Sequence, residues 1–175
     1  HIWAQDVKVK VSHSQAMTEE FGRVVLFPGC MLNYRDTASA ISALSSLKKM
    51  GLEVDLAEKE ICCGSVLMRA GIFDEKIQEI ARKNIEAMEK KGADLLVTLC
   101  PTCDMVWKHD YRLLARDFKL KTAHYSEVVK KALEKGLIEF KKPVEIKATY
   151  HDSCHLVTGP TRLVKEPREI LRRIP

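Results

Sequence analysis

The spacing of the cysteines constrains this chain more than any other feature. Six are present, and the first five follow the pattern C-x31-CC-x36-C-x2-C. They are Cys30, Cys62, Cys63, Cys100 and Cys103, with Cys154 further along the chain. The neighbours Cys62 and Cys63 are poor disulfide partners, because a bridge between adjacent residues distorts the peptide that joins them. Thiolates gathered from distant positions are the ligands of zinc, copper and iron–sulfur clusters, so the pattern indicates a metal centre.

Short apolar runs alternate with helix-like stretches along the chain. The runs predict strands at residues 23–27, 52–56, 94–99, 121–123 and 144–150. Asp36 and Asp74 stand where helix N-caps are expected, and Gly51 and Gly92 stand where those helices should stop. The alternation predicts an α/β fold, with a doubly wound, mostly parallel, Rossmann-like sheet of about five strands and helices on both faces.

This order of elements brings the cysteines together. Each of the six follows a predicted strand, so all of them should lie beyond the carboxyl edge of one sheet, where open α/β sheets build ligand sites. The N-termini of the following helices point the same way, and their partial positive charge favours thiolate over thiol. The alternative is that the cysteines serve as small buried apolar residues, which does not explain why they all follow strands.

Five clustered thiolates repel one another unless bound metal cations compensate their negative charge. A closed structural zinc site takes four ligands, and the cysteine run typical of bacterial ferredoxins is absent from the sequence. The pattern therefore favours an uncommon iron–sulfur centre. Two alternatives stay open: a zinc-stabilised scaffold for a redox complex, and a thiol–disulfide exchanger that uses Cys100 and Cys103 alone and leaves Cys30, Cys62 and Cys63 unexplained.

Charge and hydropathy exclude several classes of function. The formal net charge of +5 comes from 29 Lys and Arg against 24 Asp and Glu, and these are mixed along the chain rather than collected in a basic run. We therefore expect no nucleic-acid partner. No apolar stretch approaches the roughly 18 residues of a membrane span, so we expect no direct span. Unpaired thiols favour a reducing, cytoplasmic location, at the membrane only through partner subunits.

Four segments carry a resemblance to a known family. They read FPGCMLNY around Cys30, EICCGSVLMRAG around Cys62, LCPTCDMVWKHDY around Cys100 and YHDSCHL around Cys154. Over residues 23–157 the chain resembles the cysteine-rich CCG domain. That domain occurs in the catalytic subunits of heterodisulfide reductases, the iron–sulfur subunit of anaerobic glycerol-3-phosphate dehydrogenase, lactate-utilisation proteins and membrane complexes of sulfite reduction.

The resemblance implies a cofactor and its ligands. Cys30, Cys62, Cys63, Cys100 and Cys103 would hold a non-cubane [4Fe–4S] cluster, although some family members carry zinc at one copy of the domain. The domain is usually duplicated, and YHDSCHL is similar to the opening of a second copy, in which Cys154 would be the first ligand of a second site. We therefore expect a lead-in segment at residues 1–20, a complete module at 21–144 and the beginning of a second module at 145–175.

The resemblance also implies an activity and partners. Members of the family deliver electrons to a disulfide or pass them to quinones, so we expect an iron–sulfur oxidoreductase of heterodisulfide reductase type. The electron donor would be another redox subunit or domain that carries ferredoxin-type clusters or flavin, and the isolated chain should be inactive. His151 and His155 flank Cys154 and are candidate proton donors, or else packing histidines at a strand end. Trp107 is expected to shield the site.

Overall fold

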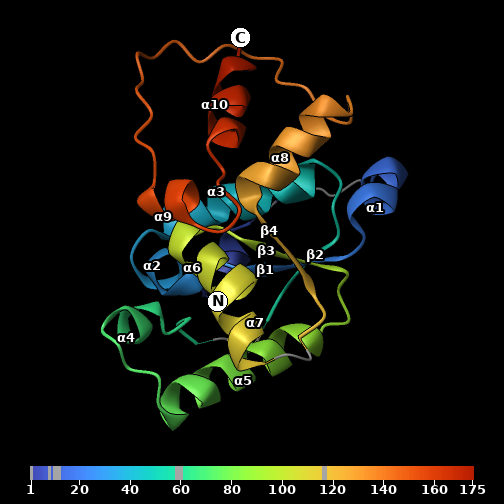
Figure 1. The fold of residues 1–175 in the computed structure, drawn as a ribbon. Coiled ribbons are helices and arrows are strands. Elements are labelled where there is room, and N and C mark those ends of the chain that lie inside the picture. The colour runs from blue at the N-terminus through green and yellow to red at the C-terminus, as the bar shows by residue number, and fades with distance from the viewer. Residues whose placement is uncertain (1, 8, 10–12, 58–60, 116–117) are drawn as a thin grey trace.

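The computed structural model of the chain describes residues 2–7, 9, 13–57, 61–115 and 118–175. These residues form a four-stranded sheet in the order β2-β1-β3-β4, and each strand is parallel to its neighbour. The strands are β1 (Val24–Phe27), β2 (Val54–Leu56), β3 (Leu95–Thr98) and β4 (Lys121–His124). The predicted doubly wound α/β architecture is confirmed, with helices on both faces of the sheet (Figure 1).

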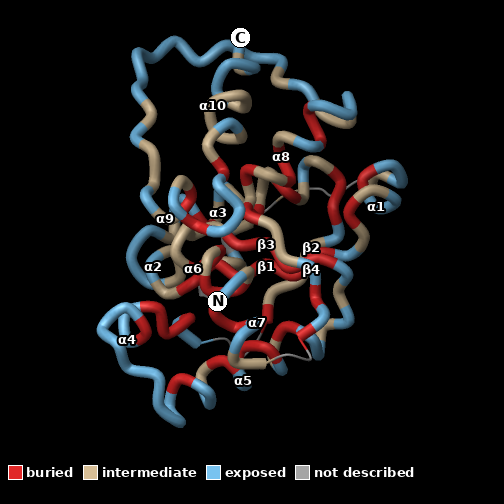
Figure 2. Tube along the Cα trace, viewed as in Figure 1, coloured by how far each residue is buried: buried red, intermediate tan, exposed pale blue. Residues whose placement is uncertain are grey.

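The two central strands are apolar throughout because both of their faces are covered. Val24 and Leu26 of β1 belong to one hydrophobic core, while Val25 and Phe27 belong to the core on the other face. All residues of β1 and β3 are buried, as the tube in Figure 2 shows. A continuous apolar run of this kind is what a parallel strand buried on both faces requires.

Two groups of helices cover the sheet. The first core packs the sheet against α5 (Glu75–Glu89), α6 (Pro101–Met105), the π-helix η2 (Val106–Asp110) and α7 (Tyr111–Leu114). The second packs it against η1 (Ile2–Asp6), α1 (Gln15–Phe21), α3 (Thr37–Lys49) and α8 (Tyr125–Glu134). In Figure 1 the sheet lies between α5 and α7 on one side and α3 and α8 on the other.

The predicted helix ends are confirmed. The Asp36 side chain accepts a hydrogen bond from the Ser39 amide at 3.2 Å, and the Asp74 side chain accepts one from the Lys76 amide at 3.0 Å. Both carboxylates satisfy amide groups that the first turn of a helix leaves unpaired. Gly51 follows α3 with φ +90°, a left-handed conformation that glycine adopts without strain.

The predicted fifth strand at residues 144–150 is wrong. Those residues are coil, residues 141–149 are all exposed, and the segment runs outside the layers of the fold (Figures 1 and 2). Alternation of apolar residues decides which face of a strand is apolar, but a strand also needs a hydrogen-bonded neighbour. None of the described strands pairs with this segment, so Val144 and Ile146 are 54% and 72% exposed.

The last residues fold back onto the sheet layers. Helix α9 (Cys154–Thr158) packs against α6, and α10 (Lys165–Arg172) packs against α8. Arg168 of α10 forms an ion pair with Asp152, and Lys130 of α8 reaches Glu169 at 3.4 Å. The division into modules at residues 21–144 and 145–175 stays a prediction. Of the expected lead-in at residues 1–20, residues 1, 8 and 10–12 lie outside the described residues.

Candidate metal centre

The cysteines follow the carboxyl ends of three parallel strands. Cys30 lies in α2 (Gly29–Tyr34), directly after β1. Cys62 and Cys63 follow β2 and precede α4 (Ser65–Arg69), while Cys100 and Cys103 follow β3, with Cys100 as the N-cap of α6. Because the strands are parallel, α2, α4 and α6 gather at the same edge of the sheet (Figure 1).

All five of these cysteines line one cavity of about 430 Å³. The other lining residues are Met31, Ser65, Val66, Arg69, Thr102 and His155. The Sγ atoms of Cys63 and Cys103 lie 3.4 Å apart, and all six cysteines of the chain are free thiols. The structure thus brings together the five cysteines that the sequence pattern singled out.

The thiols differ in their exposure. Cys63 and Cys103 are each only 3% exposed, Cys30 and Cys100 are half-buried, and Cys62 is exposed. The cavity is therefore closed on the side of the sheet and open on the side of Cys62. A group bound here would contact protein sulfur on its inner side and remain accessible to a reactant on its outer side.

Hydrogen bonds among the thiols favour a negative charge in the cavity. The Cys103 thiol and the backbone N–H groups of α6 lower the pKa of Cys100 to about 6. Donation from Cys103 and Cys62 likewise lowers the pKa of Cys63, whereas the pKa of each of those two donors is raised. Part of the thiolate charge that a metal requires is thus already favoured by the chain itself.

Gly29 makes room for the buried thiol of Cys103. Its φ of +78° lies in the left-handed region, and a Cβ atom at this position would lie 2.9 Å from Cys103 Sγ. The turn from β1 into α2 therefore requires a residue that has no side chain and tolerates positive φ. This allows the backbone before Cys30 to pass directly over the sulfur of Cys103.

A buried ion network supports the helix that carries Cys100 and Cys103. Asp104, only 2% exposed, accepts a hydrogen bond from the Thr98 hydroxyl at 3.0 Å and pairs with Lys108 at 3.0 Å. Lys108 also pairs with Glu127 of α8. Burial raises the pKa of Asp104 and the Lys108 charge opposes that rise. The network connects α6 to β3 and α8, and so holds the C-x-x-C turn against the sheet.

Two buried polar residues that the sequence interpretation missed contact the backbone of the adjacent cysteines. Asn84 of α5 donates a hydrogen bond to the carbonyl of Cys62 at 3.3 Å, and the Tyr111 hydroxyl donates one to the carbonyl of Cys63 at 3.0 Å. Asn84 could have been noticed in the sequence, because it is a polar residue within the apolar stripe of its helix. No sequence signal distinguishes Tyr111 from an ordinary core aromatic.

The three remaining expected residues lie in different places. His155 of α9 lines the cavity, and its Nδ1 lies 2.6 Å from the Thr102 hydroxyl. His151 is exposed in the coil before α9. Cys154 is exposed as well; it follows coil rather than the expected strand and is not among the residues that line the cavity.

Trp107 lies beneath the site rather than at its opening. Its ring is fully buried and packs edge-on against Phe27 and Tyr111, with ring centroids 5.3 and 4.8 Å away. Among the described residues its indole Nε1 has no hydrogen-bond partner. Trp107 thus belongs to the core that supports Cys63 and Cys103.

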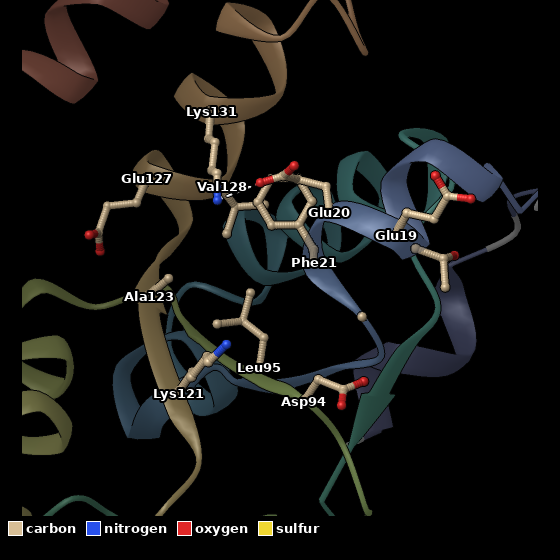
Figure 3. A pocket seen from close by; sticks show the side chains of 12 residues that line it. Glu19, Glu20, Phe21, Asp94, Leu95, Lys121, Ala123, Glu127, Val128 and Lys131 are labelled. Atoms are coloured by element: carbon tan, nitrogen blue, oxygen red, sulfur yellow. Dashed lines mark ion pairs between the residues drawn. The ribbon is translucent and has the colours of Figure 1, made fainter.

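A second cavity, of about 550 Å³, lies at the amino ends of β3 and β4 (Figure 3). The charge of Glu20 on its wall is compensated, because Glu20 pairs with Lys131 and the hydrogen bonds from Lys131 and Lys135 lower the pKa of Glu20. Lys131 also lies 5.6 Å from the centroid of the Phe21 ring. No cysteine or histidine lines this cavity, so it offers neither a thiolate nor an imidazole ligand for a metal.

The donor set and the size of the cysteine cavity fit a thiolate-bound cluster. Five sulfurs surround a space of about 430 Å³, which is wide enough for a group of several atoms. Within the described parts of the chain, no three His, Cys, Asp or Glu side chains converge as the ligands of a single ion would. The fold and the site therefore define a cysteine-rich α/β domain with a thiol-lined cavity at the carboxyl edge of its sheet.

Comparison with known proteins identifies this domain. Residues 24–108 match the model of the family described as cysteine-rich domain, CCG. This match includes all five cysteines that line the cavity. Over residues 24–108 the chain is similar to the cysteine-rich domain family, as the resemblance of its motifs indicated.

The similar curated proteins include several from methanogenic archaea. The chain is 36% identical over 166 residues to an uncharacterised iron–sulfur protein of Methanococcus maripaludis. The aligned residues make up 95% of this chain and 32% of that protein. It is 34% identical over 161 residues to a subunit of the dihydromethanophenazine:CoB–CoM heterodisulfide reductase of Methanosarcina barkeri, covering 90% of this chain and 39% of the relative. It is 33% identical over 153 residues to a subunit of the fumarate reductase (CoM/CoB) of Methanothermobacter marburgensis, and the aligned residues make up 87% of this chain and 29% of the relative.

The chain spans about a third of the length of these relatives, between 29% and 39%. No solved structure was found to match it. In the part of the chain that the structure describes, every helix is too short or too polar to cross a membrane.

Proposed function

We propose that this chain binds an iron–sulfur cluster in the cysteine cavity and transfers electrons to a disulfide or quinone-type acceptor as part of a larger redox protein. The observation that carries the proposal is the convergence of five free cysteines on one cavity. Relatives named as iron–sulfur proteins and as reductase subunits support it.

Cys30, Cys62, Cys63, Cys100 and Cys103 would hold the cluster, which we propose is a [4Fe–4S] cluster of non-cubane type. When bound, such a cluster accepts and donates single electrons. The inner thiols, Cys63 and Cys103, keep it from water on the side of the sheet. Cys62, the exposed thiol, leaves the outer side open to an acceptor.

Two residues beside the thiols, and one further away, are candidates to supply protons or positive charge. Reduction of a disulfide breaks its S–S bond and takes up two electrons and two protons to form two thiols. The Nδ1 atom of His155 lies 2.6 Å from the Thr102 hydroxyl at the cavity wall, which makes His155 the nearer candidate to deliver a proton to a departing thiolate. Arg69, which lines the cavity and pairs with Asp110, supplies positive charge near the thiolates. His151 is the second, more distant candidate for proton transfer.

The electrons must come from another part of the redox system. We propose a donor subunit or domain that carries ferredoxin-type clusters or flavin, because the described residues supply ligands for one thiolate-bound group at this cavity. The two reductase relatives are themselves subunits by name. We also propose that Cys154 belongs to a second site in a repeated module, and that the chain acts in the cytoplasm and shows no turnover by itself.

Anaerobic reconstitution with ferrous iron and sulfide tests the proposal. We expect about four iron and four acid-labile sulfide per chain and broad visible absorption. Cys63→Ser should lose most of this iron, because it removes a buried thiol of the cavity, whereas Cys154→Ser serves as the matched control and should retain it. Stoichiometric zinc without sulfide, or equal iron in both variants, would contradict the proposal.

A thiol–disulfide exchanger is the second candidate, and the lowered pKa of Cys100, about 6, favours it. An attacking thiol with such a pKa is largely ionised at neutral pH. This candidate requires only Cys100 and Cys103, so the double variant Cys62→Ser, Cys63→Ser should keep exchange activity. A cluster protein should instead lose its iron in that variant. Measuring both properties in the same preparation separates the two functions.

A further inference from the structure

The adjacent cysteines pose a conformational problem that the structure solves in a specific way. Successive side chains of an extended chain point to opposite sides, yet Cys62 and Cys63 line the same cavity. The backbone must therefore bend at this point and stay bent. Gly64 supplies part of the bend, since its φ is +76°.

Asn84 holds the first half of this bend. It is fully buried, its Oδ1 accepts the Ile61 amide hydrogen at 2.8 Å, and its Nδ2 donates to the Cys62 carbonyl at 3.3 Å. One side chain thus binds the backbone groups on both sides of the Ile61–Cys62 linkage. Its second Nδ2 hydrogen goes to the Tyr111 hydroxyl, 3.0 Å away.

Tyr111 holds the second half of this bend, at Cys63. Its ring is fully buried in the core, and its hydroxyl accepts from Asn84 and donates to the Cys63 carbonyl at 3.0 Å. The two side chains together bind backbone groups of three consecutive residues, Ile61, Cys62 and Cys63. The hydroxyl of Tyr111 thereby donates its one hydrogen and the amide of Asn84 donates both of its own.

Burying this network has a cost that apolar packing would avoid. A buried amide or hydroxyl destabilises the fold unless it is hydrogen-bonded, and Asn84 occupies the apolar stripe of α5 where leucine would pack. Fully satisfied buried networks select one conformation. Here the conformation that they select is the one that presents both adjacent thiols to the cavity.

We propose that Asn84 and Tyr111 are positioning residues for the metal centre. They hold the peptide groups of Cys62 and Cys63 so that the two neighbouring thiols reach the same bound group. The proposal rests on the proposed function for the identity of that group, although the positioning of the thiols is a property of the chain alone.

Tyr111→Phe tests the proposal, because it removes only the hydroxyl and keeps the ring. The matched control is Tyr125→Phe, which removes a hydroxyl that lies 2.7 Å from Ser46 Oγ; Tyr125 packs, partly buried, against the core on the other face of the sheet. We expect Tyr111→Phe to lose bound iron to a chelator about 10-fold faster than the unaltered chain, with an altered electron paramagnetic resonance spectrum. Tyr125→Phe should change neither.

Asn84→Leu is the second variant, because leucine keeps a similar volume on an apolar stripe. It should have the same effect on iron retention, and the double variant should be little worse than either single one, since both act through one network. Circular dichroism and thermal unfolding establish that each variant is folded. If Tyr111→Phe and Asn84→Leu retain iron and the spectrum as Tyr125→Phe does, the proposal is overturned.

Alkylation of the iron-free chain separates this proposal from the proposed function. In the unaltered chain the burial of Cys63, which is 3% exposed, should keep its alkylation by iodoacetamide slow. Tyr111→Phe should speed modification of Cys63, and Tyr125→Phe should not. If the unaltered chain binds no iron but this difference is found, the function is wrong and the positioning stands. If no difference is found, the positioning is wrong.

Discussion

The residues around the cavity are of two kinds: cysteines whose thiols line it, and residues that leave space for those thiols. The five thiols come from three segments of the chain, each of which follows a different strand, so the backbone of one segment can limit the space for a thiol of another. Gly29 is the clearest example, because the backbone before Cys30 passes over the sulfur of Cys103. The glycine therefore shapes the cysteine cavity although it contributes no thiol.

Gly29→Ala should damage the site beyond its cost to stability. Alanine at φ +78° is strained by about 1–2 kcal/mol, and its Cβ would lie 2.9 Å from Cys103 Sγ. Gly71→Ala is the matched control, since φ is +81° there and no atom lies within 4 Å. Both variants should lower the free energy of unfolding through backbone strain, Gly29→Ala further because of its contact with Cys103, and only Gly29→Ala should lower the iron bound after reconstitution. Equal iron in the two would show that the contact with Cys103 is unimportant.

At the scale of single elements, the helices begin at residues whose side chains also connect them to the rest of the fold. His124 ends β4 and caps α8: its Nδ1 accepts from the Ser126 amide at 3.3 Å, and its Nε2 reaches the Leu99 carbonyl at 3.3 Å. The imidazole is thus held neutral between a helix and the turn that leads to Cys100. Burial lowers the pKa of His124 to about 4.

This cap should make the stability of the fold depend on pH. Between about pH 6.5 and 4 the unfolded chain binds a proton on His124 that the folded chain does not. The free energy of unfolding should therefore fall as the pH is lowered through this window, by up to about 1.4 kcal/mol per pH unit. His124→Asn keeps a capping side chain without the titration. Urea denaturation at several pH values should give a flatter profile for the variant, and parallel profiles would contradict the assignment.

At the scale of the whole molecule, the sheet and its two cores are formed mainly by residues outside the cysteine cavity. The cores contain the central strands and the helices on both faces, and of the five cavity cysteines only Cys63 and Cys103 are buried in them. The fold should therefore not require a bound metal. This distinguishes the domain from small zinc modules, which unfold when their metal is removed.

Removal of the metal should lower the melting temperature but leave the chain folded. Ligand binding to the folded state alone adds to its stability, so a chelator should remove that contribution and no more. We expect the far-ultraviolet circular dichroism of the iron-free chain to match that of the loaded chain, with a cooperative transition at a lower temperature. Loss of the helical signal on chelation would instead favour the zinc-scaffold alternative.

The sequence by itself determined the local elements and the residues that converge on the site. The apolar runs, the caps at Asp36 and Asp74, and the position of each cavity cysteine after a strand depend on neighbours within a few residues. In a parallel sheet the strand ends meet at one edge, so convergence of the five cysteines followed from their order along the chain.

Tertiary structure alone decided the rest. The alternating residues 144–150 form no strand because none of the described strands pairs with them. His155 rather than His151 reaches the cavity because α9 packs against α6. Asn84 and Tyr111 contact the adjacent cysteines across 22 and 48 positions of sequence. Strand pairing and burial are set by contacts between distant segments, which no local pattern contains.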